Sequence, residues 1–297
     1  MTVTSPRVSV LMTVYNGAPW LPPAIESVLA QTCRDWELIV IENGSSDASP
    51  QILASYSDPR IHVHAVPDNI GRTPALRLAF SQARAAHIAV LDADDLAAPQ
   101  RFARQLDFMA QHPDVSVVGS WTQRIDDAGR EIGQWTPPVD RSALLDLFGY
   151  SNPIVHSSAM YRADFARAVG GYPENAPYAQ DCALWLRLAA LGPPAMLGEL
   201  LCSHRTLAVG MTRSKAGQVL VSRDTLATLE YANAHLPLST QSRARNAEER
   251  TIAAVRCGVA LVRSSRVAAG CRMLVGAAVR NPVGLLWNRV VRDALRA

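Results

Sequence analysis

The stretch of sequence that decides the fold reads Ile88-Ala89-Val90-Leu91-Asp92-Ala93-Asp94-Asp95. An apolar run of this kind is typical of a strand that is buried on both faces of a sheet, and this strand ends directly in acid. Closely spaced carboxylates repel one another, and a hard cation such as Mg²⁺ or Mn²⁺ relieves the repulsion because it prefers oxygen ligands. A solvated acidic turn is the other interpretation, but the position directly after a buried strand favours a metal site.

Earlier apolar runs have the same form. Val8–Val14 and Trp36–Ile41 are separated by a helical pattern, and the polar turns Thr13–Gly17 and Glu42–Asp47 lie at their ends. Strands that alternate with helices predict an α/β fold, with a mostly parallel sheet and helices on both faces. In such sheets ligands bind at the carboxyl ends of the strands. We therefore expect both polar turns and the acids of residues 92–95 to converge at one edge.

The rest of the chain shows two kinds of pattern. A helix is predicted over Pro99–His112, and the turn Asp126-Asp127-Ala128-Gly129 between two extended stretches predicts an antiparallel hairpin beside the parallel sheet. The last part of the chain is helical in pattern, with breaks at Pro237 and Pro282.

The length of 297 residues corresponds to one large domain or to one and a half. We predict an α/β domain over residues 1–214 and a helical C-terminal extension over residues 215–297. The five cysteines are scattered and form no C-x-x-C pair, which argues against a disulfide framework and against a zinc site. No secretory signal begins the chain, and no uncharged apolar stretch reaches the roughly 20 residues that span a bilayer, so we expect a cytoplasmic protein.

The end of the chain is strongly basic. Eight arginines and one acid, Asp293, fall between Ile252 and Ala297, whereas the whole chain has a net charge of only +3. Basic amphipathic helices bind peripherally to anionic membranes, which would place the protein at the inner face of the cell membrane. The other interpretation is a pair of helices packed on the α/β domain with their arginines in water. Nucleic acid is not an expected partner, because the basic end has few aromatic residues to stack on bases.

Five motifs follow one another along the chain: Val8–Gly17, Ser27–Thr32, Glu37–Asp47, Asn69–Gly71 and Leu91–Asp95. Together they resemble the family-2 glycosyltransferases of the GT-A fold, a Rossmann-like fold of nucleotide-diphospho-sugar transferases, over residues 7–212. Each motif alone is weak, but the ordered set is specific. The resemblance implies inverting transfer of a sugar from a nucleotide-diphosphate sugar donor to a hydroxyl of a saccharide or lipid-linked saccharide acceptor. It further implies a place in the synthesis of cell-surface polysaccharide or glycolipid.

The resemblance also implies roles for individual residues. The residues that fall where the family contacts the donor nucleotide are Thr13, Tyr15, Asn16, Glu42, Asn69, Gly71, Arg72 and Asp92. Most members carry aspartate at the position of Glu42, so the identity of the base is left open. The sequence Asn-x-Gly at residues 69–71 is also common in simple turns.

Metal-binding and catalytic roles are implied in the same way. Asp94 would bind Mn²⁺ or Mg²⁺ with His204 beside it, and Asp181 would act as general base. His156 and Gln180 fall near the acceptor or the diphosphate, although Gln180 stands where the family usually has glutamate. Helix capping is the other interpretation of Asp181, since aspartate is favoured at the start of a helix. For each of the two histidines the other interpretation is a purely structural role.

Other classes of protein fit the sequence less well. A dinucleotide oxidoreductase requires G-x-G-x-x-G after the first strand, which Tyr15-Asn16-Gly17-Ala18-Pro19 does not supply. The Q-x-x-R-W motif and the membrane helices of processive synthases are missing, which favours the transfer of single sugars. The remaining alternative is a non-catalytic nucleotide-sugar-binding or scaffold protein of the same fold. Asp94 and Asp181 argue against this alternative, whereas Gln180 and Glu42 argue for it.

Overall fold

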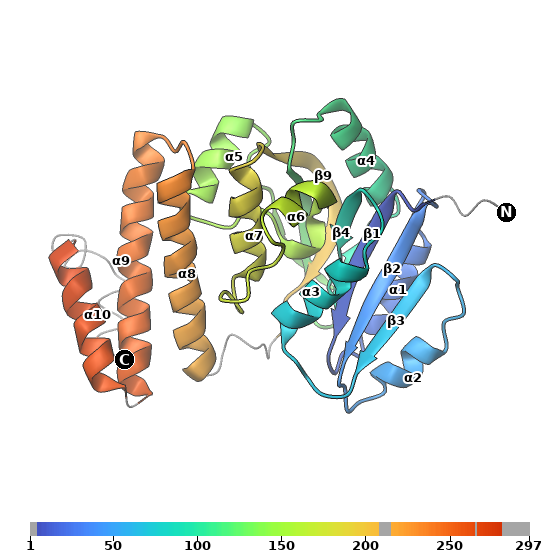
Figure 1. Cartoon of the computed structure of the whole chain (residues 1–297), viewed down its shortest axis with the longest axis horizontal. Coiled ribbons are helices and arrows are strands. Elements are labelled where there is room, and N and C mark those ends of the chain that lie inside the picture. The colour runs from blue at the N-terminus through green and yellow to red at the C-terminus, as the bar shows by residue number, and fades with distance from the viewer. Residues whose placement is uncertain (1–4, 208–214, 265, 281–297) are drawn as a thin grey trace.

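The computed structural model describes residues 5–207, 215–264 and 266–280, and in this part of the chain a nine-stranded mixed sheet carries helices on both faces (Figure 1). The hydrogen-bonded order of the strands is β3-β2-β1-β4-β8-β6-β9-β5, and β7 pairs with β6. Long helices continue the chain beyond the sheet, at the left of Figure 1. The predicted α/β fold is confirmed.

The first half of the sheet is parallel, as predicted. It consists of β1 (Val8–Val14), β2 (Trp36–Asn43), β3 (Ile61–Val66) and β4 (His87–Val90), which are connected by α1 (Leu21–Leu29), α2 (Ser49–Ala54) and α3 (Arg72–Gln82). β1 lies between β2 and β4, and Val14 pairs with Glu42. The polar turns after β1 and β2 therefore leave the sheet side by side.

Beyond β4 the sheet becomes mixed. The elements in chain order are β5 (Leu96–Ala97), α4 (Arg101–Gln111), β6 (Val117–Ile125), β7 (Glu131–Trp135), α5 (Arg141–Phe148), the 3-10 helix η1 (His156–Ser158), β8 (Met160–Arg162), α6 (Ala163–Ala168), α7 (Gln180–Ala189) and β9 (Pro194–Arg205). β6 and β7 form the predicted antiparallel hairpin, and β8 joins β4 to β6 by antiparallel pairing on both sides.

The long strand β9 was not predicted from the sequence. It pairs in parallel with β6, and the register of the pair shifts on both sides of Trp121. These irregularities break the period of two between buried and exposed residues, so the sequence of β9 shows no strand pattern. The strand ends with His204 and Arg205, and it therefore positions a residue that the sequence assigns to the site.

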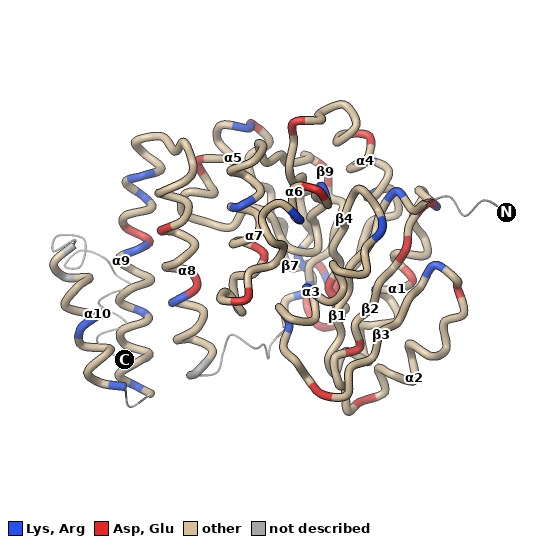
Figure 2. The backbone as a smooth tube through the Cα atoms, viewed as in Figure 1, with Lys and Arg blue, Asp and Glu red and all other residues tan. Residues whose placement is uncertain are grey.

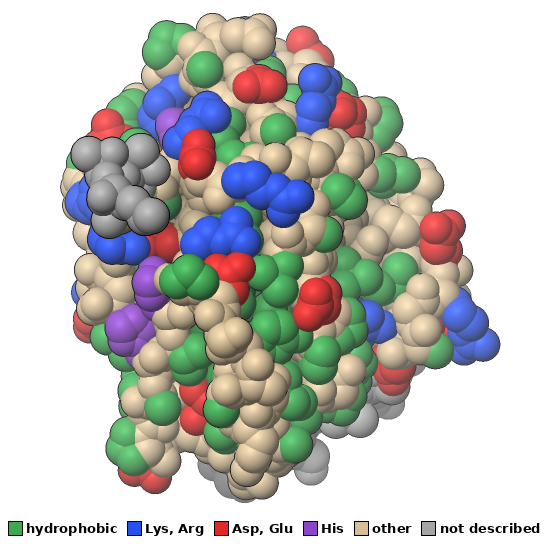
Figure 3. Space-filling view, turned by 90° about the vertical axis from the view of Figure 1, so that its right-hand side faces the viewer, with side chains coloured by type: hydrophobic (Ala, Val, Ile, Leu, Met, Phe, Trp, Pro, Cys, Tyr) green, Lys and Arg blue, Asp and Glu red, His purple; other side chains and the backbone are tan. Residues whose placement is uncertain are grey.

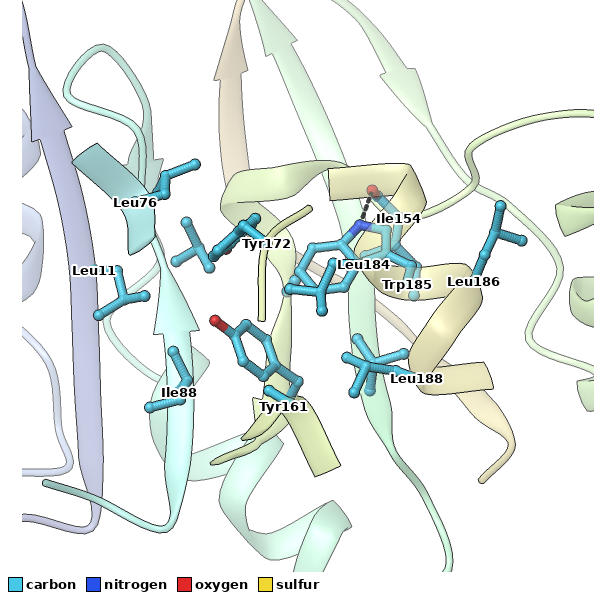
Figure 4. Close-up of a cluster of buried hydrophobic side chains, with 14 of the residues drawn as sticks. Leu11, Leu76, Ile88, Ile154, Tyr161, Tyr172, Leu184, Trp185, Leu186 and Leu188 are labelled. Carbon is cyan, nitrogen blue, oxygen red and sulfur yellow. Dashed lines mark hydrogen bonds between the residues drawn. The ribbon is translucent and has the colours of Figure 1, made fainter. Parts of the chain in front are cut away.

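Buried side chains fill both faces of the sheet. Leu11 and Ile39 belong to the cluster that includes α3 and α7, whereas Val10 and Leu38 belong to the cluster that includes α1 and α4. This division follows from the alternation of side chains along a strand. Figure 4 shows the first cluster, in which Trp185 of α7 lies among aliphatic side chains and donates its indole N–H to the carbonyl of Ile154 at 3.2 Å.

The described part of the C-terminal extension consists of α8 (Lys215–His235), α9 (Thr240–Arg263) and α10 (Val267–Arg280). The predicted break at Pro237 separates α8 from α9, whereas the predicted break at Pro282 lies outside the described residues. Ala232 of α8 and Leu236, the residue after α8, are buried in the same cluster as side chains of α5 and α7. A division of the chain at residue 215 remains a prediction. None of the described helices combines the length and the apolar character needed to span a bilayer.

Candidate active site

Hydrogen bonds connect the polar turns that follow β1 and β2. Asn16 has a left-handed backbone, with φ of 52°, and its Oδ1 accepts the backbone N–H of Ser46 at 2.9 Å. The backbone N–H of Asn16 donates to Ser45 Oγ at 3.0 Å, and that of Ala18 donates to Asp47 Oδ2 at 3.0 Å. Asparagine tolerates the left-handed conformation better than most residues. The structure thus brings the first two predicted clusters together.

A third loop, residues 68–71, is fastened to the same edge by Asn43, a residue to which the sequence assigned no role. Asn43 Nδ2 donates to Asn69 Oδ1 at 3.1 Å, and Asn43 Oδ1 accepts the N–H of Ile70 at 3.1 Å. A Cβ on Gly44, which has φ of 73°, would lie 2.6 Å from the carbonyl carbon of Asp68, so only glycine fits there. Asn69 and Gly71 therefore lie beside the end of β2.

The remaining nucleotide candidates differ in exposure. Tyr15 is 51% exposed and Thr13 is half-buried, so both are open to a ligand at this edge. Glu42 is only 5% exposed, and its Oε1 accepts the backbone N–H of Ser45 at 2.7 Å. One oxygen of the Glu42 carboxylate therefore stabilises the turn itself.

Asp92 lies at the centre of a polar network. Arg72 Nη2 donates to both carboxylate oxygens of Asp92, at 2.7 and 2.6 Å, and His156 Nδ1 lies 3.0 Å from Asp92 Oδ1. The hydroxyl of Tyr172 lies 3.0 Å from His156 Nε2, and Ser157 Oγ accepts the backbone N–H of Asp92 at 3.0 Å. Burial alone would raise the pKa of Asp92, but the charges of Arg72 and His156 outweigh burial and hold that pKa well below its usual range.

Gln180, at the start of α7, joins this network from the other side. With its amide oriented to satisfy both partners, Gln180 Oε1 accepts from Arg72 Nε at 3.0 Å and Gln180 Nε2 donates to the carbonyl of Pro177 at 3.0 Å. Because the amide of Gln180 is neutral, it does not compete with Asp92 for the ion pair with Arg72. Tyr172 and Ser157 are the members of the network that the sequence did not single out, because a role for them depends on contacts across the fold.

The three acids after β4 have different environments. Carboxylate oxygens of Asp92, Asp94 and Asp95 lie within 4.8 Å of one another. Asp95 is 1% exposed, and its Oδ1 accepts the backbone N–H of Arg205 at 2.7 Å while its Oδ2 lies 3.2 Å from His204 Nδ1. The hydrogen bond to Asp95 raises the pKa of His204 above its ordinary value. Asp95 therefore fastens the acidic turn to the end of β9.

Asp94 is the acid that this arrangement leaves for a cation. Burial, together with the negative charges of Asp95 and Asp92, raises the pKa of Asp94 to about 7. No lysine or arginine in the described part of the chain forms a salt bridge with it. A half-buried carboxylate beside two further carboxylates and an imidazole is a donor set that suits Mn²⁺ or Mg²⁺. The residues present therefore fit a divalent cation held by the cluster of Asp92, Asp94 and Asp95, and His204 adjoins this cluster through the contact of its Nδ1 with Asp95.

Asp181 lies in the first turn of α7, but it does not cap the helix. The N-cap residue is Ala179, and no side-chain capping hydrogen bond is formed. Instead, Asp181 Oδ2 accepts a hydrogen bond from Asn152 Nδ2 at 3.0 Å. The negative charge of Asp181 is also near enough to Arg72 to favour its charged form. The capping interpretation is therefore wrong, and Asp181 adjoins the network around Asp92.

Solved structures define the class of this fold. TarS of S. aureus (residues 1–349) has a TM-score of 0.65 and 14% identity, covering 98% of this chain and 91% of that one. The mannosyltransferase PcManGT from Pyrobaculum calidifontis, solved in complex with GDP-Man and Mn²⁺, has a TM-score of 0.63 and 18% identity, covering 99% of this chain and 86% of that one. At these identities the likeness shows the fold alone, which is GT-A.

The family follows from the sequence comparisons. The model of glycosyl transferase family 2 matches residues 9–170, more than half of the chain, and the protein therefore belongs to this family of glycosyltransferases. EpsE of Bacillus subtilis, named as a glycosyltransferase, is 32% identical over 190 residues, which are 62% of this chain and 67% of EpsE. The amylovoran biosynthesis glycosyltransferase AmsE of Erwinia amylovora is 28% identical over 202 residues, 66% of this chain and 75% of AmsE.

The raised pKa of Asp94 predicts how Mn²⁺ binding depends on pH. A carboxyl with a pKa of about 7 is mostly protonated below pH 7, and a cation must then displace the proton. We expect the dissociation constant for Mn²⁺ to rise about tenfold for each pH unit below 7 and to level off above it. Titration of free Mn²⁺ by electron paramagnetic resonance, repeated at pH values from about 5.5 to about 8, measures this dissociation constant.

Asp127→Asn is the matched control, because Asp127 is an exposed acid in the hairpin turn and should leave the titration unchanged. Asp94→Asn should weaken Mn²⁺ binding and remove most of its pH dependence. An affinity for Mn²⁺ that stays constant across this range would contradict the assignment of Asp94.

Proposed function

We propose that this family-2 glycosyltransferase transfers single sugars, with inversion, from a nucleotide-diphosphate sugar to an acceptor hydroxyl, and that it uses Mn²⁺ or Mg²⁺. The observation that carries the proposal is the cluster of Asp92, Asp94 and Asp95, which His204 contacts through Asp95 and in which the pKa of Asp94 is raised to about 7. Perturbed carboxylates that cluster at the carboxyl edge of an α/β sheet are typical of functional sites. The rival scaffold function gives no reason for an acid held in this state.

The donor nucleotide is proposed to lie along the edge formed by the connected turns. In support, the loop after β1 is hydrogen-bonded to the loop after β2, and Asn43 at the end of β2 is hydrogen-bonded to the loop after β3. Arg72 and Asp92 are paired beside these loops. The proposed donor contacts are Thr13, Tyr15, Asn16, Glu42, Asn69, Gly71, Arg72 and Asp92. TarS has been solved with UDP and with UDP-GlcNAc, and PcManGT has been solved with GDP-Man. Both a uridine and a guanosine donor are therefore compatible with this fold.

The proposed chemistry is one displacement at the anomeric carbon of the donor sugar. The acceptor oxygen forms the new bond to this carbon while Asp181 takes the hydroxyl proton, and the bond to the diphosphate oxygen breaks with its electron pair leaving on the nucleoside diphosphate. Attack from the face opposite the leaving group inverts the configuration. A bound cation supplies positive charge that stabilises the departing diphosphate. Asp94, with His204, would hold that cation.

A direct test uses UDP-glucose, UDP-GlcNAc and GDP-mannose as donors and 4-nitrophenyl glycosides as acceptors. We expect nucleoside diphosphate release and a glycosylated product with one donor class in the presence of Mn²⁺, loss of both after treatment with EDTA, and recovery when Mn²⁺ is restored. Unchanged turnover after EDTA would refute the metal requirement. Donor binding without any product from the panel would favour the scaffold alternative.

Asp181→Asn tests the general base. The amide cannot take a proton, so we expect kcat to fall by about 10² to 10⁴ with an unchanged dissociation constant for the donor. Asp164→Asn is the matched control, because Asp164 is an exposed acid in the first turn of α6 and should leave kcat unchanged. An Asp181→Asn variant with wild-type turnover would exclude Asp181 from the role.

The acceptor is proposed to be a saccharide or a lipid-linked saccharide of cell-surface polysaccharide or glycolipid synthesis, and the protein to act in the cytoplasm at the inner face of the membrane. The similarity to AmsE, a glycosyltransferase of amylovoran biosynthesis, supports this setting. On α10, Val267, Val275 and Val279 are 53%, 63% and 77% exposed, and exposed Cys271 lies between them at helical spacing. The exposed arginines Arg266 and Arg272 border this apolar stripe, and α10 contains no acid (Figure 2). By contrast, the face in Figure 3 mixes basic and acidic side chains.

An apolar stripe bordered by arginines suits the interface of an anionic membrane. We expect the protein to sediment with vesicles of phosphatidylglycerol and phosphatidylcholine at low salt, and Val275→Glu combined with Val279→Glu to reduce the bound fraction severalfold. Val63→Glu on β3, where Val63 is 43% exposed, is the matched control. Absence of binding at low salt, or an equal loss in the control, would dismiss the membrane contact.

A further inference from the structure

A pocket lies between the α/β part and the extension, where α7 and α8 run side by side (Figure 1). Its volume is about 310 Å³, and its wall is formed by the start of α7, the segment of residues 148–152 and the middle of α8. This volume is at the lower end of the range for small-molecule sites, about 300 to 1,000 Å³. The lining residues on which the argument rests are Tyr150, Asn152, Tyr178, Asp181, Thr225 and Thr228.

Asp181 connects this pocket to the donor edge. Asp181 lines the pocket, and its carboxylate accepts a hydrogen bond from Asn152 Nδ2 at 3.0 Å. The preceding residue, Gln180, contacts Arg72, which is paired with Asp92. The proposed general base therefore lines the pocket and also lies near enough to Arg72, the partner of Asp92, for its charge to act on Arg72.

The helix α8 is held firmly enough to form a defined wall. Asp224 is 1% exposed, and its Oδ2 accepts the backbone N–H of Tyr178 at 2.9 Å. Asn246 of α9 donates to the carbonyl of Leu229 on α8 at 2.8 Å and also to the carbonyl of Gly149. These bonds fix α8 to both of the loops that line the pocket. The position of Thr225 and Thr228 relative to Asp181 is therefore set by hydrogen bonds and by packing.

The lining has the chemistry of a sugar site. Tyr150 and Tyr178 provide aromatic rings with polar tips, while Thr225, Asn152 and Asp181 provide hydroxyl, amide and carboxylate groups. Asn152 Oδ1 is buried and has no hydrogen-bond partner within the described residues. Buried acceptors are rarely left unpaired in native proteins, and a sugar hydroxyl is a donor that could complete this one. A pyranose has apolar C–H faces that suit aromatic rings and hydroxyl groups that suit polar side chains, so it matches this lining.

We propose that this pocket is the acceptor subsite, that it takes the pyranose ring of a glycoside, and that the extension contributes acceptor specificity through Thr225 and Thr228 of α8. The inference rests on the proposed transfer reaction, because it uses Asp181 as the base. It goes further in assigning the helices beyond residue 215 a direct part in substrate choice. The α/β part then selects the donor, and the junction with the extension selects the acceptor.

Thr225→Phe tests this assignment, because the larger side chain fills the pocket from a half-buried position on α8. We expect kcat/KM for 4-nitrophenyl glycosides to fall by about tenfold or more, with the donor KM unchanged within about twofold. Ala227→Phe places the same side chain at an exposed position of the same helix and should leave both constants unchanged. Thermal melting and UDP or GDP binding confirm that each variant is folded.

Saturation-transfer NMR with the same 4-nitrophenyl glycosides gives a readout that needs no turnover. We expect binding to the wild type and to Ala227→Phe, and loss of binding in Thr225→Phe. If no donor supports transfer but this pattern of binding is found, the proposed reaction fails and the sugar pocket stands. If transfer occurs and Thr225→Phe keeps its acceptor kcat/KM, or if the wild type binds none of the glycosides, the acceptor subsite is refuted.

Discussion

The arrangement of the site depends on the ion pair between Arg72 and Asp92. Asp92 lies two residues after the central strand β4, and Arg72 begins α3, so the pair connects the sheet to a helix that covers it. His156 of η1 and Gln180 of α7 complete the contacts of these two side chains. The four residues are far apart in the chain. His156 contacts Asp92 and Gln180 contacts Arg72, and both of these charged side chains are only partly exposed. Removal of either charge would take away the largest favourable interaction of the other, leaving only His156 to compensate Asp92, or Asp181 and Asp94 to compensate Arg72.

The three acids after β4 differ in how their negative charges are compensated. Asp92 is compensated by Arg72, and Asp95 is compensated by His204 and by the N–H of Arg205. The burial of Asp94, together with the repulsion from both neighbours, raises its pKa, whereas the charges of Arg72 and His156 lower that of Asp92. Three acids that look equivalent in the sequence therefore have three different environments. Their difference comes from cations and N–H groups supplied by distant segments.

The extension is part of the same structure as the α/β fold. Side chains of α8 are buried with those of α5 and α7, and the hydrogen bonds of Asp224 and Asn246 fasten the helices to the loops at residues 149 and 178. A basic net charge on α10 and a packed inner face on α8 are compatible with one another. The two interpretations of the C-terminal helices, packing and membrane contact, therefore concern different helices.

The sequence by itself determined the parallel half of the sheet and the place of the site. Apolar strands that end in polar turns are a local pattern, and the position of Asn16, Asn69 and Asp92 at one carboxyl edge follows from the direction of parallel strands. The structure alone decided which acid is paired, because Arg72, His156 and Arg205 reach the acids across the fold. It also decided the course of β9, whose bulges hide the strand period, and the pocket at Asp181, whose wall needs α8 from beyond residue 215. Local periodicity predicts elements, whereas charge compensation and cavities arise from contacts between segments distant in sequence.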